Sequence, residues 1–264
     1  MDEIRLVALI KDVCFPQSKI SVKDIIDAGG LREFIEETYN KYKISPSTAL
    51  RVFSVGRNKG LLEAIKILKS IDVIDFEIYF LTPFQVLTEE DLVFPYRECL
   101  DSLSIDDIKK YFEIFGVADE VLEIIESQPD ILYIYANSKL VKFLKLLDYV
   151  PKGTIGILAI DTPAVSKLEN LKIVYPTHKT IVQLKKVGAK IRTENFGGSL
   201  LTHIAIVLNK LSMEMKRDNF VNFIRMAKDK SDFFFEAIFG SEVYNAIKKE
   251  MLPSLLKFLK TSSQ

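Results

Sequence analysis

The segment GRNKG, residues 56–60, has the composition of a loop that could hold a phosphate group. It follows the β-branched and aromatic run 51–55 and precedes an amphipathic stretch, so it is expected to join a strand to a helix. Its two glycines permit tight backbone turns, and the basic side chains between them offer charge to an anion. It matches neither common glycine-rich phosphate motif, and an ordinary solvated turn explains the same residues. The candidate ligands are Gly56, Arg57, Asn58 and Lys59.

A long irregular connection, residues 83–100, follows the next apolar run, 75–82. It lacks helical or strand periodicity, yet it is too apolar for a loop lying in water. Connections of this length are usually functional or disordered, and the apolar content argues against disorder. We expect it to place Thr82, Tyr96 and Arg97 at a ligand site. The alternative is a lid of packing residues with Arg97 exposed.

Two further strand ends offer polar side chains. Asn137 follows the apolar run 131–136, where it either caps the next helix or contacts a ligand. Asp161 follows the run 154–160, where its carboxylate either binds ribose hydroxyls or starts a turn. Because the carboxyl ends of parallel strands meet at one edge of a sheet, the candidates are expected to converge there.

Motifs for catalysis and metal binding are absent from the sequence. No Ser/His/Asp order and no zinc-protease or nucleophile-elbow motif occurs, so no catalytic residue, metal or cofactor is assigned. His203 lies in an apolar helical run, which favours packing, and His178 is expected to be exposed. The cysteines, Cys14 and Cys99, stand in unrelated contexts, a pattern that argues against a zinc site and excludes a disulfide framework.

Alternating strands and helices are expected to position these residues. Strands are predicted at 51–55, 75–82, 131–136, 154–160 and 172–176, with amphipathic helices such as 60–71 and 138–150 between them. Continuous apolar strands separated by helices indicate a mainly parallel sheet that is covered on both faces. The fold class is therefore predicted to be α/β and Rossmann-like.

Three regions are expected along the chain. Residues 1–50 are predicted to be a mainly helical segment, 51–196 the α/β core, and 199–264 a helical appendage. Gly197-Gly198 is the expected hinge between the core and the appendage. The aromatic residues of the appendage are expected to be buried either against a second copy of the chain, as a homodimer, or against the chain's own N-terminal helices.

The composition limits the classes of partner. The 264 residues carry 36 basic and 36 acidic side chains, so the net charge gives no attraction to nucleic acid or to an anionic membrane. No apolar stretch approaches the roughly 18 residues of a membrane span, and a cytoplasmic location is expected. Frequent Ile, Lys and Glu, with no Trp, are typical of a thermophilic archaeon or its virus, and a low genomic GC content is the alternative explanation of the Ile and Lys.

Residues 51–160 resemble an uncharacterised α/β domain family found in archaea, bacteria and phages. The resemblance rests on residues 56–59 and on the segments LTPFQVLTEEDLVFPYRECL, YIYANSKL and KGTIGIL. The chain departs from the family at Arg97, where Asp is usual, at Gln85-Val86, where Gly is usual, and at Ala136-Asn137, where Ala-Gly is usual. The family layout is similar to that of Rossmann-like proteins that handle nucleotides or nucleosides, so the resemblance implies a ligand of that class.

We therefore expect a protein that binds a nucleotide or nucleoside-like small molecule at the carboxyl edge of its sheet. An N-glycosyl enzyme is one form of this hypothesis, and the sequence leaves enzymatic activity open. The alternatives are a non-enzymatic interaction protein, such as a viral or mobile-element accessory factor, and a dimeric sensor of a nucleotide signal with a helical output region.

Overall fold

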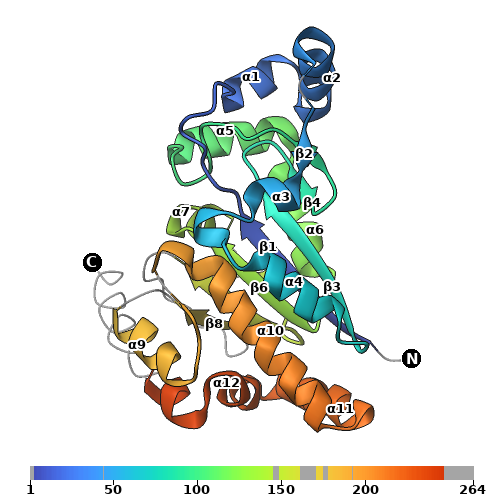
Figure 1. Cartoon of the computed structure of the whole chain (residues 1–264), viewed down its shortest axis with the longest axis vertical. Coiled ribbons are helices and arrows are strands. Elements are labelled where there is room, and N and C mark those ends of the chain that lie inside the picture. Colours follow the sequence, from blue (N-terminus) through green and yellow to red (C-terminus); the bar gives the residue numbers. More distant parts are fainter. Residues whose placement is uncertain are drawn as a thin grey trace.

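A six-stranded sheet forms the centre of the fold (Figure 1). The computed structural model describes residues 3–43, 45–144, 149–160, 171–174, 178–191 and 193–246. The strand order is β4-β3-β1-β6-β7-β8. The bounds are β1 Ile4–Lys11, β3 Ile74–Leu81, β4 Val86–Thr88, β6 Ile131–Ala136, β7 Ile155–Ile160 and β8 Leu171–Val174. All neighbouring strands are parallel except β4, which runs antiparallel to β3 at the edge.

The central strand β1 contradicts the prediction that residues 1–50 are mainly helical. All of its residues except Arg5 are buried. Its side chains alternate between the two layers: Leu6, Ala8 and Ile10 enter one hydrophobic cluster, and Val7 and Leu9 enter the other. A strand buried on both faces has no polar alternation, so periodicity could not separate it from a buried helix.

The predictions for four other strands are confirmed. β3, β6, β7 and β8 each begin within one residue of the predicted starts at 75, 131, 154 and 172. β6 and β7 are buried at every position, as expected for inner strands of a parallel sheet.

Helices cover both faces of the sheet. On one face lie α4 (Leu61–Lys69) and α10 (Phe196–Glu214), which pack against each other. On the other face lie α5 (Ile105–Phe115), α6 (Val117–Glu126) and α7 (Ser138–Phe143). Figure 1 shows α4 and α10 in front of the strands and α7 and α6 behind them. The chain is therefore an α/β protein with a mostly parallel sheet flanked by helices.

The prediction of a strand at 51–55 is wrong, because the chain forms helix α3 (Ala49–Phe53) there. Its buried face places Phe53 against Phe80 and Tyr96, with ring centroids 5.4 and 6.0 Å apart. This tertiary packing outweighs the β propensity of the segment. The GRNKG segment therefore follows a helix, and its first three residues form the 3₁₀ turn η1 (Gly56–Asn58).

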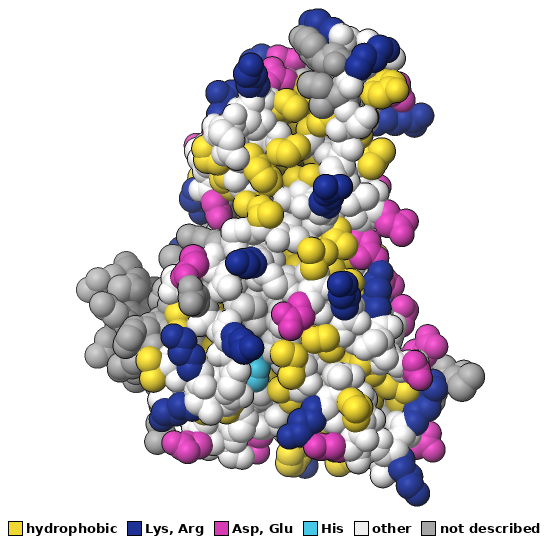
Figure 2. All heavy atoms as spheres, in the orientation of Figure 1, with side chains coloured by type: hydrophobic (Ala, Val, Ile, Leu, Met, Phe, Trp, Pro, Cys, Tyr) yellow, Lys and Arg dark blue, Asp and Glu magenta, His cyan; other side chains and the backbone are white. Residues whose placement is uncertain are grey.

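The N-terminal helices lie at one end of the molecule. They are α1 (Val22–Asp27) and α2 (Leu31–Tyr42), followed by a small sheet of β2 (Ser47–Thr48) and β5 (Leu92–Val93). A capping box formed by Ser21 and Asp24 starts α1. Figures 1 and 2 show these elements at the top, where hydrophobic side chains gather on the surface.

The C-terminal helices lie at the opposite end (Figure 1). They are α9 (His178–Lys186), α11 (Arg217–Asp229) and α12 (Ser231–Phe239), and the 3₁₀ turn η2 (Thr193–Asn195) precedes α10. The tail aromatics are buried within the chain itself: Phe235 stacks on Phe239 and on Tyr244, and Phe234 is fully buried. They pack with α10 and α11 rather than with the N-terminal helices. The homodimer predicted through these helices therefore gains no support from them.

Gly197-Gly198 is not a hinge, because both residues lie inside α10 and are buried. A Cβ at Gly197 would lie 2.2 Å from Cδ1 of Tyr135, and one at Gly198 would lie 2.4 Å from the Asn58 carbonyl oxygen. The glycines thus let α10 approach the sheet and the η1 turn more closely than any other residue type would permit.

Candidate functional site

The strand order defines a switch point in the sheet between β1 and β6. From β1 the chain passes to β3 on one side, and the later strands β6, β7 and β8 follow on the other side. In open parallel sheets, ligands bind at the carboxyl ends of the strands that flank such a point. Here those ends carry Lys11-Asp12 after β1 and Asn137 after β6.

A charged cluster occupies this point. Nζ of Lys11 lies 2.7 Å from each carboxylate oxygen of Asp101, although the lysine side chain is only 1% exposed. The ammonium group also lies over the ring of Tyr135, 4.8 Å from its centroid. Nδ2 of Asn137 donates to the same carboxylate at 2.8 Å, while its Oδ1 accepts from the Leu140 amide and caps α7. The charge of Lys11 is thus neutralised inside the protein.

A second buried pair lies beside the first. The Tyr96 hydroxyl donates to Oδ2 of Asp12, and the Leu100 amide donates to Oδ1 at 3.0 Å. Burial raises the pKa of Asp12 to about 7, even though both hydrogen bonds favour its ionised form. Burial, together with the neighbouring Asp12 carboxylate, also raises the pKa of Tyr96 well above its ordinary value. The Asp12 carboxyl group therefore changes its charge near neutral pH.

Contrary to the prediction, the connection 83–100 is not irregular throughout, because it contains β4 and β5. Together with Asp101 it forms a lid, residues 83–101, that closes this edge. Its aromatic side chains pack inward: the rings of Phe84 and Tyr96 meet edge to face, with their centroids 5.2 Å apart. A disulfide joins Cys99 in this connection to Cys14, just after β1. This bond contradicts the exclusion of disulfides, because cysteines 85 residues apart in sequence are brought to a Cα–Cα distance of 4.7 Å by the fold. The packing alternative given for the segment therefore describes most of it.

The predicted site residues divide between different environments. Asn58, Tyr96 and Asn137 meet around Lys11 and Asp12: Nδ2 of Asn58 donates to the Lys11 carbonyl at 3.0 Å. Oδ1 of Asn58 is buried and has no hydrogen-bond partner among the described residues.

Of the other predicted residues, Thr82 borders this group. Its buried hydroxyl is a hydrogen-bond neighbour of Tyr96, and it donates to the Gln85 carbonyl at 2.6 Å. The half-exposed Arg97 lies apart and pairs with Glu98. Gly56 lies in η1 with a φ of 55°. The side chain of Arg57 and the whole of Asp161 lie outside the described residues. Lys59 lines a separate cavity.

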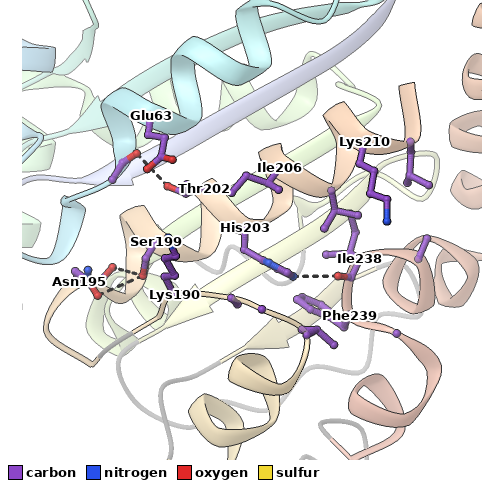
Figure 3. A pocket seen from close by; sticks show the side chains of 18 of the residues that line it. Glu63, Lys190, Asn195, Ser199, Thr202, His203, Ile206, Lys210, Ile238 and Phe239 are labelled. Carbon is purple, nitrogen blue, oxygen red and sulfur yellow. Dashed lines mark hydrogen bonds between the residues drawn. The ribbon is translucent and has the colours of Figure 1, made fainter. Parts of the chain in front are cut away.

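That cavity has a volume of about 610 Å³ and lies on the outer side of α10 (Figure 3). Helix α10 forms its floor, the start of α4 forms one wall, and the segments 187–190 and 237–240 form the other. Figure 3 shows Ser199, Thr202, His203, Ile206 and Lys210 on this floor. Volumes of 300–1,000 Å³ are typical of small-molecule sites.

One end of the cavity is polar. Lys59 and Lys190 lie there with Glu63, Asn195, Ser199 and Thr202. Both lysines are exposed, and neither forms an ion pair with a residue that the structure describes. The N-terminus of α4 opens into the same end at Gly60, whose carbonyl accepts from the Thr202 hydroxyl at 3.0 Å. Unpaired lysines beside a helix N-terminus favour an anion.

The other end of the cavity is mainly apolar. Ile206, Val207, Leu211, Ile238 and Phe239 line it, with the exposed pair Lys210–Glu214 at its rim. His203 lies between the two ends, stacked on Phe239, and its Nε2 is 3.1 Å from the Ile238 carbonyl oxygen. This contact requires a proton on Nε2, which leaves Nδ1 of the neutral ring as an acceptor. Burial lowers the pKa of His203, so the neutral form is favoured.

Sequence reasoning missed several residues of both regions. Lys11 and Asp12 carry a usable signal, because they end an apolar run with two charges, as a strand end at a sheet edge does. Asp101 and Lys190 carry no comparable signal, since only the fold brings Asp101 to Lys11 and Lys190 to the cavity. The prediction that His203 is a packed residue is confirmed, but its place on the cavity floor was not predicted.

The described residues contain neither a metal site nor a membrane-spanning helix. They contain no group of three or more His, Cys, Asp or Glu side chains that could hold a metal ion. Within the same ranges, no helix is both long enough and apolar enough to cross a bilayer.

No protein-family model matches the chain, and no curated protein or solved structure is significantly similar to it. The family resemblance of residues 51–160, and the ligand class that it implies, therefore stay predictions.

Proposed function

We propose that this chain is a Rossmann-like protein that binds an anionic small molecule, of nucleotide or nucleoside phosphate type, in the cavity on α10. The observation that carries the proposal is the division of a 610 Å³ cavity into a basic polar end and an apolar end. An anionic group and an apolar or aromatic group on one ligand fit these two ends.

The polar end supplies the anion contacts in this proposal. Lys59 and Lys190 provide two ammonium groups, and the positive end of the α4 helix dipole lies beside them at Gly60. Charge-assisted hydrogen bonds of this kind are about twice as strong as neutral ones. The lining contains three lysines and two glutamates, a net charge of 3 − 2 = +1 with His203 neutral, which favours a ligand with negative charge.

The apolar end supplies the contacts for a base or a similar ring. Ile206, Val207 and Phe239 offer aliphatic and aromatic surface, and Nδ1 of His203 can accept a hydrogen bond from a ligand N–H or O–H. The predicted ligand class is retained, while its location moves from the edge of the sheet to α10.

Thermal unfolding in the presence of nucleotides, nucleosides and sugar phosphates tests the proposal. A ligand at about 100 times its dissociation constant should stabilise the protein by about 2.7 kcal/mol. The double substitution Lys59→Ala/Lys190→Ala should weaken binding about 100-fold or more, since two charged hydrogen bonds of about 1.5–3 kcal/mol each are lost.

The matched control is Lys66→Ala/Lys185→Ala. It removes two exposed lysines, on α4 and on α9, that do not line the cavity. It should bind the ligand as the wild type does. If no compound in the panel stabilises the protein, or if both double variants bind equally well, the proposal is wrong.

A further inference from the structure

We propose that Lys11 and Asn137 form a second anion-binding site, at the switch point of the sheet, and that the Asp101 carboxylate of the same chain occupies it as an internal ligand. The external ligands of this site are compact oxyanions, namely carboxylate or phosphate groups. The inference does not depend on the cavity on α10, because the two sites share no residue.

The donors of the site are held by the framework of the sheet. Lys11 ends β1, and its Nζ approaches both oxygens of the carboxylate at 2.7 Å. Asn137 follows β6 and adds Nδ2 at 2.8 Å, with its orientation fixed by the cap that it makes on α7. The ring of Tyr135 lies beneath the ammonium group. These groups are set where a parallel sheet of this order binds its ligands.

The acceptor comes from a different part of the chain. Asp101 lies in the lid, in a turn closed by a hydrogen bond from the Ser102 amide to the Cys99 carbonyl. Two anchors hold this turn next to β1: the Cys14–Cys99 disulfide and the contact between the Leu100 amide and Asp12. The carboxylate is thus delivered by a loop to donors that belong to the sheet.

The site is open to solvent on the Asp101 side. The Asp101 side chain is 33% exposed, in contrast to the buried lysine that it covers. Lys139 stands at the rim, where its Nζ donates to the Leu103 carbonyl at 2.9 Å. A shallow hollow beyond it is lined by Lys109, Lys139 and Lys142, and these charges raise the local concentration of anions. An oxyanion can therefore reach the place of the carboxylate once Asp101 is withdrawn or shortened.

The decisive variant is Asp101→Ala, which removes the internal carboxylate and leaves Lys11 buried without it. Both a purely structural ion pair and an occupied anion site predict a loss of stability, about 5–10 °C in Tm. Rescue by added oxyanion is expected only if Lys11 and Asn137 keep their positions without Asp101, as a preorganised anion site requires. Formate is the first probe, because it is a free carboxylate of the size that Asp101 supplies, and inorganic phosphate is the second.

At about ten times its dissociation constant, formate should raise the folding equilibrium constant of Asp101→Ala about tenfold, a Tm rise of about 3–5 °C. Sodium chloride at equal ionic strength should not do so. The wild type should respond much less than Asp101→Ala, because an added anion must first displace the Asp101 carboxylate. Stronger rescue by phosphate than by formate identifies a phosphate-bearing ligand, and rescue by formate alone identifies a carboxylate.

Two control variants make the result specific. Glu113→Ala removes an exposed negative charge from α5 and should respond to formate no more than the wild type. Lys11→Met/Asp101→Ala lacks the central donor and should lose the rescue. If Asp101→Ala does not fold in chloride, the yield of refolding with and without formate replaces the Tm. The absence of rescue in Asp101→Ala, or an equal effect in the variant without Lys11, overturns the proposal.

Discussion

Removal of the Cys14–Cys99 disulfide should lower the free energy of unfolding by several kcal/mol. The bond closes a loop spanning 85 residues of sequence. The chain-entropy relation for a loop of this length gives a stabilisation of about 4.5 kcal/mol at 25 °C, exerted mainly through the unfolded state. The folded lid keeps its other anchors, the hydrogen bonds to Asp12 and the Lys11–Asp101 pair. We therefore expect a folded but less stable protein.

Urea unfolding of the oxidised wild type and of Cys14→Ala/Cys99→Ala measures this difference. The midpoint should fall, and the slope m should rise, because an unfolded chain without the cross-link exposes more surface. Thiol titration of the unfolded wild type is the control: both cysteines of the chain take part in the bond, so no free thiol should be found. Free thiols in the oxidised protein, or a stability difference below about 1 kcal/mol, would refute this reasoning.

Two further substitutions test the switch point and the seat of α10. The pKa of Asp12 rises from 3.8 to about 7 on folding, so the folded state keeps a proton that the unfolded chain has released. The contribution of this proton to the free energy of unfolding is complete below pH 3.8. It falls by about 4 kcal/mol as the pH rises from 3.8 through 7. Asp12→Asn can keep the contact with Tyr96 without this charge, so its stability relative to the wild type should increase between pH 4 and pH 8 in urea unfolding; parallel pH profiles would contradict this. Gly197→Ala should cost about 1–3 kcal/mol in the same assay, because its Cβ would lie 2.2 Å from the Tyr135 ring, whereas Gly153→Ala, which meets only the end of a lysine at 3.9 Å, should be nearly neutral.

Much of the sheet could be predicted because inner parallel strands are short apolar runs bounded by helices. The runs 131–136 and 154–160 are of this kind, and both are strands. The N-terminal run of β1 has the same character, but no preceding element marks it as part of a βαβ unit. The segment 51–55 fails for the opposite reason: its composition suits a strand, while the packing of Phe53 on Tyr96 fixes a helix. Local propensity cannot reveal a contact across 43 residues of sequence.

Part of the candidate site could be predicted, because the sequence alone shows which residues follow a strand. Asn137 and Tyr96 follow strands, and both belong to the network at the switch point. Thr82 also reaches this network, because its hydroxyl neighbours Tyr96. The direction of a side chain depends on its neighbours in space, so Arg97 follows the same strand but uses its charge locally, with Glu98. Asp101 was missed because its partner, Lys11, lies 90 residues away in a strand that the sequence did not reveal.

The two proposed sites meet at one side chain, and this determines how they can be tested. Tyr135 carries the Lys11 ammonium over its ring, and the edge of the same ring lies against Gly197 at the start of α10, the helix that forms the floor of the cavity. A substitution at Tyr135 would therefore disturb both sites and could not assign an effect to either. Asp101 is linked to this ring through the Lys11 ammonium, whereas Lys59 and Lys190 lie at the cavity wall. Loss of nucleotide binding in the lysine variant with intact rescue by formate in Asp101→Ala, or the reverse, would show that the sites act independently. If Asp101→Ala lost both formate rescue and nucleotide binding, the cause would be a disturbed packing of α10 on the sheet.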